Sequence, residues 1–214
     1  IAALAPVIAP FDPTEIAIGS DFVRPGTAAI DGSGRLHYLG TDQIGRDYLS
    51  RLMYAARISL LVALTSQIIS VVIGVIIGAA SGYFGGTFDA ITMRFVEFLL
   101  TIPQLPLLLI ISSLLLQNKD AIPIPEFLRN FVAWLLIIRS DNAVQVIMVI
   151  AILAGFGWLG EARLIRGVVL SLREQTFTEA SRALGASDAR IIFTHMIPNS
   201  IAPMIVSATL GLSG

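Results

Sequence analysis

Residues 58–80 read ISLLVALTSQIISVVIGVIIGAA, a run of 23 residues without a charge. A helix needs about 20 apolar residues to cross the hydrocarbon of a bilayer. The stretch therefore predicts a membrane-spanning helix, which we place at about 58–82. Gly74, Gly78 and Gly82 recur every fourth residue, so they share one helix face and let a neighbouring backbone approach closely. We expect this face to be a helix-packing seam.

The composition of the whole chain agrees with a membrane protein. Of 214 residues, 55% are hydrophobic and 14% are charged, whereas a soluble domain carries about a quarter charged residues. A formal net charge of −1 argues against a nucleic-acid partner. The sequence has no cysteine and only two histidines, which excludes disulfides and thiolate metal sites and leaves little for a zinc site. We expect no metal site, no cofactor bound by this chain and no catalytic residue.

Three further apolar segments predict additional spans, at about 91–116, 143–165 and 197–214. Pro103 and Pro106 predict a kink or local unwinding inside the first of them. The last segment stops before a crossing is complete. Residues 127–139, FLRNFVAWLLIIR, fit an interfacial or re-entrant helix better than a full span. Residues 1–9 read as the end of a truncated first transmembrane helix.

The stretch 10–57 is polar and rich in turn-forming residues. It predicts a loop outside the hydrocarbon, with short strands or a hairpin at the Gly32-Ser33-Gly34 turn. Asp42 and Asp47 lie close to Arg46 in this loop. Two carboxylates without other ligands favour turn and helix-cap roles over a cation site.

Arg94 and Glu97 lie three residues apart near the start of the 91–116 segment, so they can pair on one helix face. Ionisable groups near membrane helices are often functional. A structural pair at the membrane edge is nevertheless favoured here over a pair that lines a pathway.

A polar segment follows the 143–165 span, and its residues 176–190 read TFTEASRALGASDAR. Thr176 and Glu179 have the spacing of a capping box, Gly185 suits a left-handed helix end, and Ser187 can cap a second helix. The segment 174–196 thus predicts two short helices joined by a turn, too polar for lipid. From spacing alone, a local capping role for Glu179 and a role in docking to a partner are equally well supported.

The segment resembles the EAA loop of ABC importer permeases, whose pattern is Glu-Ala-Ala, three residues, Gly and, about nine residues later, Ile-x-Leu-Pro. Glu179, Ala180, Gly185, Ile197 and Pro198 keep this register, while Ser181 replaces the second Ala and His195 the Ile. Two further blocks, LGTDQIGRD at 39–47 and GYFGG at 82–86, are similar to the second, C-type permease subunit of the dipeptide, oligopeptide and nickel importers.

The resemblance implies an all-α integral membrane protein, a polytopic helix bundle with the type I ABC importer transmembrane fold, whose core permease domain covers 58–212. It implies a multi-pass subunit of the inner or plasma membrane that forms the path for peptides, nickel or another small solute. A homologous permease subunit would complete a heterodimer in the lipid bilayer. Two ATPase subunits, which bind ATP and Mg, would drive transport, and an extracytoplasmic binding protein would deliver the substrate.

By the same resemblance, the loop 174–196 is cytoplasmic and couples to an ATPase. The residues implied in this contact are Glu179, Ala180, Ser181, Gly185, Ala186, Ile197 and Pro198. The loop 10–57 is then extracytoplasmic. Basic residues do not support this orientation, since eight lie outside and six inside, but long loops translocate regardless of charge. The residues that bind substrate stay unknown.

Two other classes of function stay open at this point. Gly211-Leu212-Ser213-Gly214 matches the G-x-S-G of rhomboid-type intramembrane serine proteases, but no histidine follows Ser213 in this sequence to act as a base. A stand-alone channel would need a selectivity filter, which the sequence does not offer, and would leave the 174–196 loop unexplained.

Overall fold

The computed structural model describes residues 4–30, 32–117, 124–136 and 140–211, and it divides the chain into two units, Ile1–Val62 and Ala63–Gly214. The first unit contains little regular structure. The described part of residues 1–9 forms a single helical turn, α1 (Ala5–Ile8). Strand β1 (Thr27–Ala28) pairs antiparallel with β2 (Leu36–His37), so the hairpin expected at the Gly-Ser-Gly turn is confirmed.

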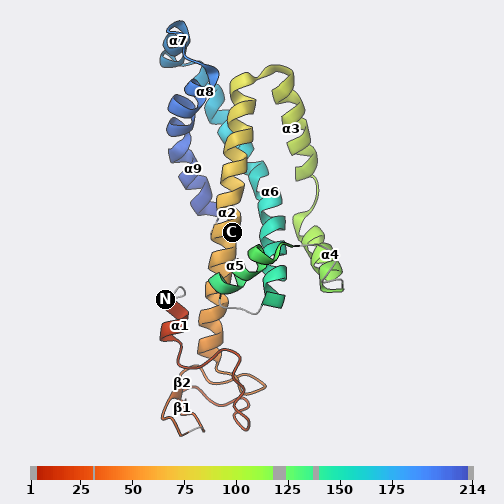
Figure 1. The fold of residues 1–214 in the computed structure, drawn as a ribbon, viewed down its shortest axis with the longest axis vertical. Helices are drawn as coiled ribbons and strands as arrows, with labels where there is room; N and C mark the ends of the chain where they lie inside the picture. Colours follow the sequence, from red (N-terminus) through yellow and green to blue (C-terminus); the bar gives the residue numbers. More distant parts are fainter. Residues whose placement is uncertain (1–3, 31, 118–123, 137–139, 212–214) are drawn as a thin grey trace. The chain divides into compact units, whose positions relative to one another are not determined.

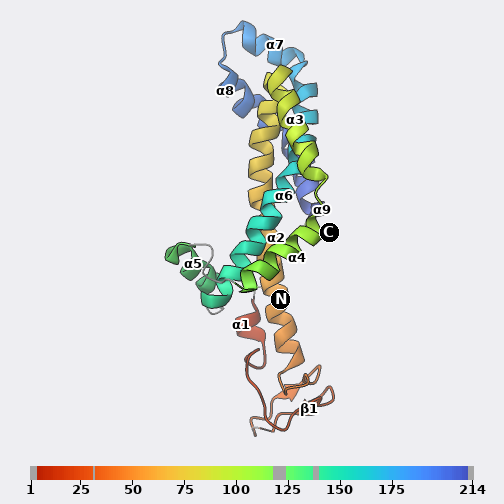
Figure 2. The same ribbon diagram turned by 90° about the vertical axis from the view of Figure 1, so that its right-hand side faces the viewer.

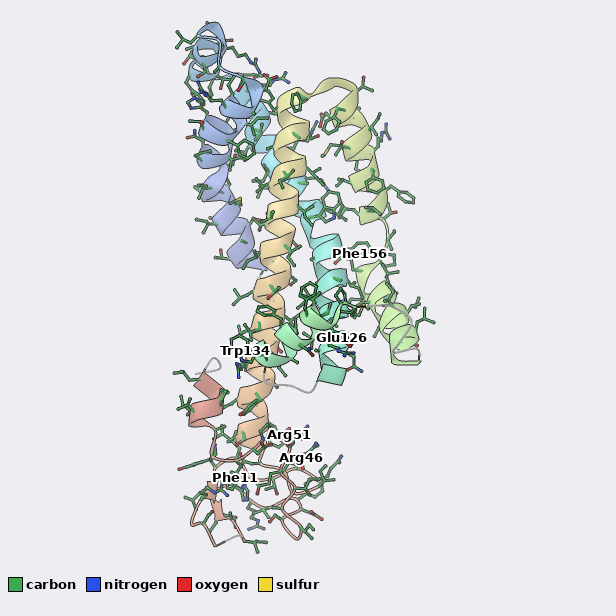
Figure 3. All side chains as sticks on the ribbon, viewed as in Figure 1. Phe11, Arg46, Arg51, Glu126, Trp134 and Phe156 are labelled. Atoms are coloured by element: carbon green, nitrogen blue, oxygen red, sulfur yellow. The ribbon has the colours of Figure 1, made fainter. Side chains whose placement is uncertain are left out.

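Asp42 holds the turn that leads to the first long helix, α2 (Tyr48–Phe84). Its Oδ1 accepts hydrogen bonds from the backbone N–H groups of Ile44 and Arg46, both at 3.0 Å, and its Oδ2 pairs with the guanidinium groups of Arg46 and Arg51. Figure 3 labels these two arginines. Burial raises the pKa of this carboxyl, but these N–H groups and the Arg46 guanidinium outweigh burial and lower it to about 2. Asp42 therefore has the turn role expected for it.

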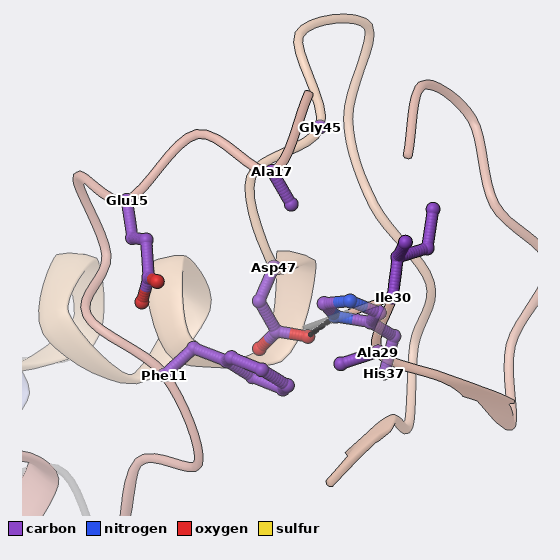
Figure 4. Close-up of a pocket in the computed structure, with 8 residues that line it drawn as sticks. All are labelled: Phe11, Glu15, Ala17, Ala29, Ile30, His37, Gly45 and Asp47. Atoms are coloured by element: carbon purple, nitrogen blue, oxygen red, sulfur yellow. Dashed lines mark hydrogen bonds and ion pairs between the residues drawn. The ribbon is translucent and has the colours of Figure 1, made fainter. Parts of the chain in front are cut away.

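Asp47 caps the start of α2. Its Oδ2 accepts a hydrogen bond from the backbone N–H of Ser50 at 2.8 Å, and its Oδ1 lies 2.9 Å from Nδ1 of the buried His37. The ring of Phe11 stacks on the imidazole with 4.4 Å between centroids (Figure 4). The expected helix-cap role is confirmed, and the imidazole adds a second contact that the sequence did not reveal.

The second unit, Ala63–Gly214, is a helix bundle that contains the rest of α2. The elements that follow are α3 (Gly86–Leu100), α4 (Gln104–Gln117), α5 (Glu126–Leu136), α6 (Ser140–Arg173), α7 (Thr176–Ala183), α8 (Asp188–Ile191), the π-helical turn η2 (Ile192–Met196) and α9 (Ile197–Gly211) (Figure 1). Among the described residues, three helices are long and apolar enough to cross a membrane, and the bent pair α3–α4 is a fourth candidate. The helical membrane fold expected from the sequence is confirmed.

The helix boundaries differ from the expected ones. The first span begins at Tyr48 rather than 58, and the third continues to Arg173 rather than 165. Charged residues end a hydrophobic run but do not end a helix, because their side chains reach water from a helix that projects past the hydrocarbon. The span expected from 197 begins at Asp188, since η2 joins α8 to α9, and its 24 residues are long enough to cross.

The span expected at 91–116 is broken. α3 ends at Leu100, α4 begins at Gln104, and the two are bent by 71°. Pro103 lies at the break, and the carbonyl of Phe98 accepts from both the N–H of Thr101, at 3.1 Å, and its hydroxyl, at 2.7 Å, which closes the end of α3. The kink expected from Pro103 is confirmed, whereas Pro106 lies in the first turn of α4, where proline is tolerated.

The expected interfacial segment 127–139 is represented by α5, whose 11 residues are too few for a crossing. Residues 137–139 lie outside the described residues. The same holds for residues 212–214, with Ser213 of the G-x-S-G match.

α2, α6 and α9 lie side by side in both views (Figures 1 and 2). A buried core joins α2 and α6 to α8 and η2, and Ile197 and Met204 of α9 pack against it. The core consists of Val75, Ala79, Tyr83, Ile165, Val169, Ile191 and Met196. The structure places the three seam glycines against α6. A Cβ added at Gly74 would lie 2.4 Å from the Cβ of Glu161. A Cβ at Gly78 would lie 2.5 Å from the carbonyl oxygen of Ala162, and a Cβ at Gly82 would lie 2.8 Å from the carbonyl oxygen of Arg166. Close packing of α2 on α6 therefore requires glycine at these positions.

Candidate functional site

Residues 174–196 form a short helical hairpin between α6 and α9, which we call the α7–α8 hairpin (Figure 1). Its entry differs from the expected capping box. The helix already includes Thr176 and follows Gln175, whose side chain makes no capping hydrogen bond. The backbone N–H groups of Thr178 and Glu179 donate to the carbonyl of Gln175, at 3.0 and 3.3 Å. Because the backbone already satisfies these donors, the capping box predicted for Thr176 and Glu179 is wrong.

Thr178 fastens α7 to α6 instead. Its side chain is fully buried, and its hydroxyl donates to the carbonyl of Leu172, in the last turn of α6, at 2.8 Å. A helix leaves its last carbonyls without intrahelical partners, so this hydroxyl completes the end of α6 while it fixes the start of α7.

The turn between the two short helices is closed at both sides as the sequence predicts. Gly185 has φ +77°, its N–H donates to Arg182 at 2.9 Å, and the N–H of Ala186 donates to Ser181 at 3.0 Å. These two bonds make a Schellman motif. Ser187 then caps α8 by accepting from the N–H of Arg190 at 3.4 Å. The hairpin is thus a locally defined unit.

Tyr83, near the end of α2, anchors the hairpin to the bundle. It is only 4% exposed, and its hydroxyl donates to Oδ1 of Asp188 at 2.7 Å. The Arg182 guanidinium lies 5.1 Å from the centre of its ring, and the Arg173 guanidinium donates to its carbonyl at 3.2 Å. The end of α6 and both short helices of the hairpin therefore contact one residue, Tyr83, near the end of α2. The sequence indicated only a helix break here.

The residues expected to contact an ATPase divide into two groups. Glu179, Ala180, Gly185 and Pro198 are exposed, whereas Ser181, Ala186 and Ile197 are partly buried. Ala186 and Ile197 pack against the core, and the Ser181 hydroxyl donates to the carbonyl of Phe177 at 2.8 Å. His195 packs on the Phe177 ring with 5.8 Å between centroids. The first group is available to a partner, and the second supports the hairpin from within.

Two apolar side chains beside these residues are exposed to solvent. Leu184 is 88% exposed at the tip of the hairpin, and Phe193 is 68% exposed on η2. Burial of a leucine or phenylalanine side chain contributes about 1.5–3 kcal/mol. An apolar side chain at a protruding turn is therefore a strong candidate for contact with a partner.

A second polar contact links the start of α3 to α6. Both carboxylate oxygens of Asp89 accept from the guanidinium group of Arg166, and the Ser81 hydroxyl donates to the same carboxylate. Asp89 does not cap α3, because Gly85 occupies the cap position. Asp89 therefore joins helices rather than ending one.

Glu161 is a buried carboxylate that sequence analysis missed. Only 5% exposed on α6, it accepts through Oε1 from the side chains of Gln67 on α2 and Ser207 on α9, both at 3.0 Å. Its spacing from Ala162, Ile165 and Val169 places it on the buried face, and that periodicity was the signal that could have revealed it.

A groove lies between α3 and α6, lined by Met93, Glu97, Leu100, Gly160, Arg163, Leu164 and Arg166. The pair expected between Arg94 and Glu97 does not occur among the ion pairs of the described residues, since Glu97 faces this groove and Arg94 is not part of its lining. The hairpin and the groove occupy separate places in the bundle.

Comparison with known proteins connects these features to a family. Residues 53–214 match the family described as binding-protein-dependent transport system inner membrane component. The chain is 33% identical over its full length to a dipeptide transport system permease of Haemophilus influenzae, and 30% identical over 87% of its length to an oligopeptide transport system permease of Mycobacterium tuberculosis.

A putative peptide permease of Brucella abortus is 37% identical over 81% of the chain. The chain spans 62%, 55% and 49% of these three relatives' own lengths. None of the three is named as a protease. With its membrane-spanning helices and its match over most of the sequence, the chain belongs to the family of inner membrane components of binding-protein-dependent transport systems, as a multi-pass protein with the type I ABC transmembrane fold.

Proposed function

We propose that this chain is the permease subunit of an ATP-driven peptide importer and that an ATPase subunit acts on its α7–α8 hairpin. The observation that carries the proposal is that the hairpin is exposed on one side and attached to the helix bundle on the other. Its tip exposes Glu179, Ala180 and Leu184, while its inner side is fixed to α2 and α6 through Tyr83 and Thr178. A surface that is both open to a partner and rigidly attached suits the transfer of force.

The attachment favours movement of whole helices rather than of a loop. α6 has 34 residues and is about 50 Å long at about 1.5 Å per residue. A helix of this length that pivots in the membrane converts displacement at the hairpin into opposite displacement at its other end. Rigid-body rocking of this kind is a common basis of alternating access.

The substrate class follows from the relatives, which are named as dipeptide and oligopeptide permeases. On this proposal the chain pairs with a homologous permease subunit, two ATPase subunits bind and hydrolyse ATP with Mg, and an extracytoplasmic binding protein supplies the peptide. The chain itself performs no covalent chemistry and needs no cofactor.

The test uses the complete transporter with Leu184→Asp or Glu179→Lys in this chain, and Asp21→Lys in the 10–57 loop as a matched control. We expect both hairpin variants to insert in the membrane but to lose the ATPase subunits on gel filtration and to lose ATP-driven peptide uptake. The control should keep both. Normal assembly and uptake in both hairpin variants would contradict the proposal.

Orientation has an independent test, because the sequence contains no cysteine. Ala183→Cys introduces a single exposed thiol on α7. An impermeant maleimide should label it in inside-out vesicles and not in intact cells. Labelling from outside intact cells would place the hairpin away from any cytoplasmic ATPase.

A further inference from the structure

The groove between α3 and α6 carries three charged side chains, Glu97, Arg163 and Arg166. Arg166 is already engaged, because its guanidinium group makes two hydrogen bonds to the carboxylate of Asp89. Within the described ranges, neither Arg163 nor Glu97 forms a close ion pair, although the Glu97 carboxylate attracts the Arg166 guanidinium across the groove. The charged side chains that line the groove sum to +1. Because Asp89 already holds Arg166, Arg163 is the cation and Glu97 the anion that the groove can offer to a ligand.

Both side chains belong to helices that form candidate membrane spans. An ionisable side chain within a membrane-spanning helix is costly, and it occurs mainly where it faces a water-filled cavity or a transport path. Exposed charges without ion-pair partners on two facing helices therefore indicate an aqueous path between them rather than contact with lipid tails.

The break between α3 and α4 is a second, independent sign. Leu100 lines the groove and is the last residue of α3, so the groove adjoins the 71° bend. Interrupted helices in membrane proteins bring unpaired backbone groups to the sites where transporters hold their substrates. The charges and the break meet at the same place in the bundle.

We propose that this groove is a segment of the translocation path that receives a short peptide by its two charged ends. Arg163 binds the terminal carboxylate, for which a guanidinium group has a matching pair of donors, and Glu97 binds the terminal ammonium. An uncharged solute would leave both groups unpaired. A lone anion, such as a lipid phosphate, would pair with Arg163 but meet the repulsion of Glu97. The inference rests on the proposed function, since it assigns residues to the peptide path.

The experiment measures peptide binding to the purified complex of permease and ATPase subunits without the binding protein, so that the selectivity of the binding protein does not enter. The probes are trialanine, its C-terminal amide and its N-acetyl derivative, titrated by saturation-transfer NMR in nanodiscs of neutral lipid. Arg163→Gln, Arg163→Lys and Glu97→Gln are compared with the wild type, and Arg24→Gln in the 10–57 loop is the control.

We expect Arg163→Gln to weaken trialanine binding by about tenfold or more and to leave the amide unaffected, because a charge-assisted hydrogen bond of this kind is worth about 1.5–3 kcal/mol. Arg163→Lys should recover part of the loss. Glu97→Gln should weaken trialanine and not its N-acetyl derivative. The control should bind all three peptides as the wild type does.

Equal affinity of all variants for trialanine would overturn the inference, as would an equal loss for trialanine and its amide. Loss of wild-type peptide binding on addition of anionic lipid would assign the groove to lipid and also overturn it. ATP-driven peptide uptake, measured in parallel with the binding protein present, separates the two proposals. If the wild type takes up peptides but the variants lack the expected binding pattern, only the role of the groove is contradicted. If the wild type takes up no peptide, the proposed function is contradicted.

Discussion

The hydroxyl of Tyr83 donates a hydrogen bond to Oδ1 of Asp188 at 2.7 Å, across 105 residues of sequence. The contact joins the end of α2 to the first turn of α8, and the Tyr83 ring lies in the same buried cluster as Val169 and Met196. A displacement of the hairpin therefore reaches α2 through a polar bond and through core packing at the same side chain.

Tyr83→Phe should loosen this junction without opening the core, because the ring stays and only the hydroxyl is lost. A hydrogen bond of this kind contributes about 0.5–1.5 kcal/mol. We expect a slightly lower melting temperature of the purified complex and fewer peptides transported per ATP hydrolysed. Tyr38→Phe, at a side chain that is 58% exposed, is the control and should change neither value. An unchanged transport ratio in Tyr83→Phe would show that the bond is not needed for coupling.

The glycine seam gives a prediction with an internal control on the neighbouring helix. Gly78→Ala places a methyl group 2.5 Å from the backbone oxygen of Ala162, which cannot move without shifting α6. Overpacking of this kind costs about 1–3 kcal/mol. Gly167→Ala meets no atom within 4 Å and should be neutral or slightly stabilising, since alanine is the better helix former. Thermal unfolding of the two variants in detergent measures the difference, and equal melting temperatures would argue against close α2–α6 packing.

The contact between Asp89 and Arg166 predicts a rescue. Asp89→Asn leaves the guanidinium group without its carboxylate, and we expect a loss of about 2 kcal/mol, because breaking a partly buried pair costs less than breaking a fully buried one. Arg166→Asp alone should be at least as harmful, since it places two carboxylates together. The exchange Asp89→Arg with Arg166→Asp should restore part of the stability. A double-mutant cycle measures this coupling, and additive losses would mean that the two side chains do not interact.

Asp42 predicts how the 10–57 loop responds to acid. Its pKa is lowered from 3.8 to about 2 in the folded protein, so the carboxylate contributes stability that is fully present above pH 4 and is lost as the pH falls toward 2. Hydrogen exchange of the Ile44 and Arg46 amides, which donate to Asp42, should therefore accelerate in this range after correction for the intrinsic rate. In Asp42→Asn these amides should exchange readily already at pH 6. Protection that persists below pH 2 would contradict the assignment.

Whether a feature of the fold could be predicted from the sequence depends on how far apart in the sequence the interacting residues lie. The existence of the spans, the break at Pro103 and the left-handed turn at Gly185 follow from runs of a few residues, and each was predictable. The helix ends were not, because the residues that fix them come from elsewhere: Thr178 completes the end of α6, and η2 joins α8 to α9. The polar contacts of Glu161, Asp89 and Tyr83 cross 46 to 105 residues, and no local pattern reveals such partners.

The candidate functional residues also divide into those with a local sequence signal and those brought together only by the fold. The shape of the hairpin was predictable because its residues form one continuous motif, and its left-handed turn follows from the position of Gly185. The groove was missed because Glu97 and Arg163 belong to different helices and become neighbours only through packing of α3 on α6. Helical spacing pointed to Arg94 as the partner of Glu97. It gave no sign that Glu97 lies in a groove with Arg163 of another helix.

The backbone at Gly185 allows a graded test of the hairpin. Its φ of +77° lies in the left-handed region, where a side chain costs about 1–2 kcal/mol, although no atom of the protein obstructs a Cβ there. Strain and not collision should therefore set the order of the variants. Gly185→Asn should be nearly neutral because asparagine tolerates this conformation, Gly185→Ala should be intermediate, and Gly185→Val should be the most harmful because of its branched Cβ. The loss should appear first in association with the ATPase subunits, measured by co-purification, since the turn presents Leu184 to the partner. The same three substitutions at the exposed Gly155 of α6 provide the contrast, because that position is helical and alanine should be the best tolerated of the three there. If co-purification followed side-chain size at Gly185, with asparagine no better than valine, the left-handed turn would not be what positions the docking surface.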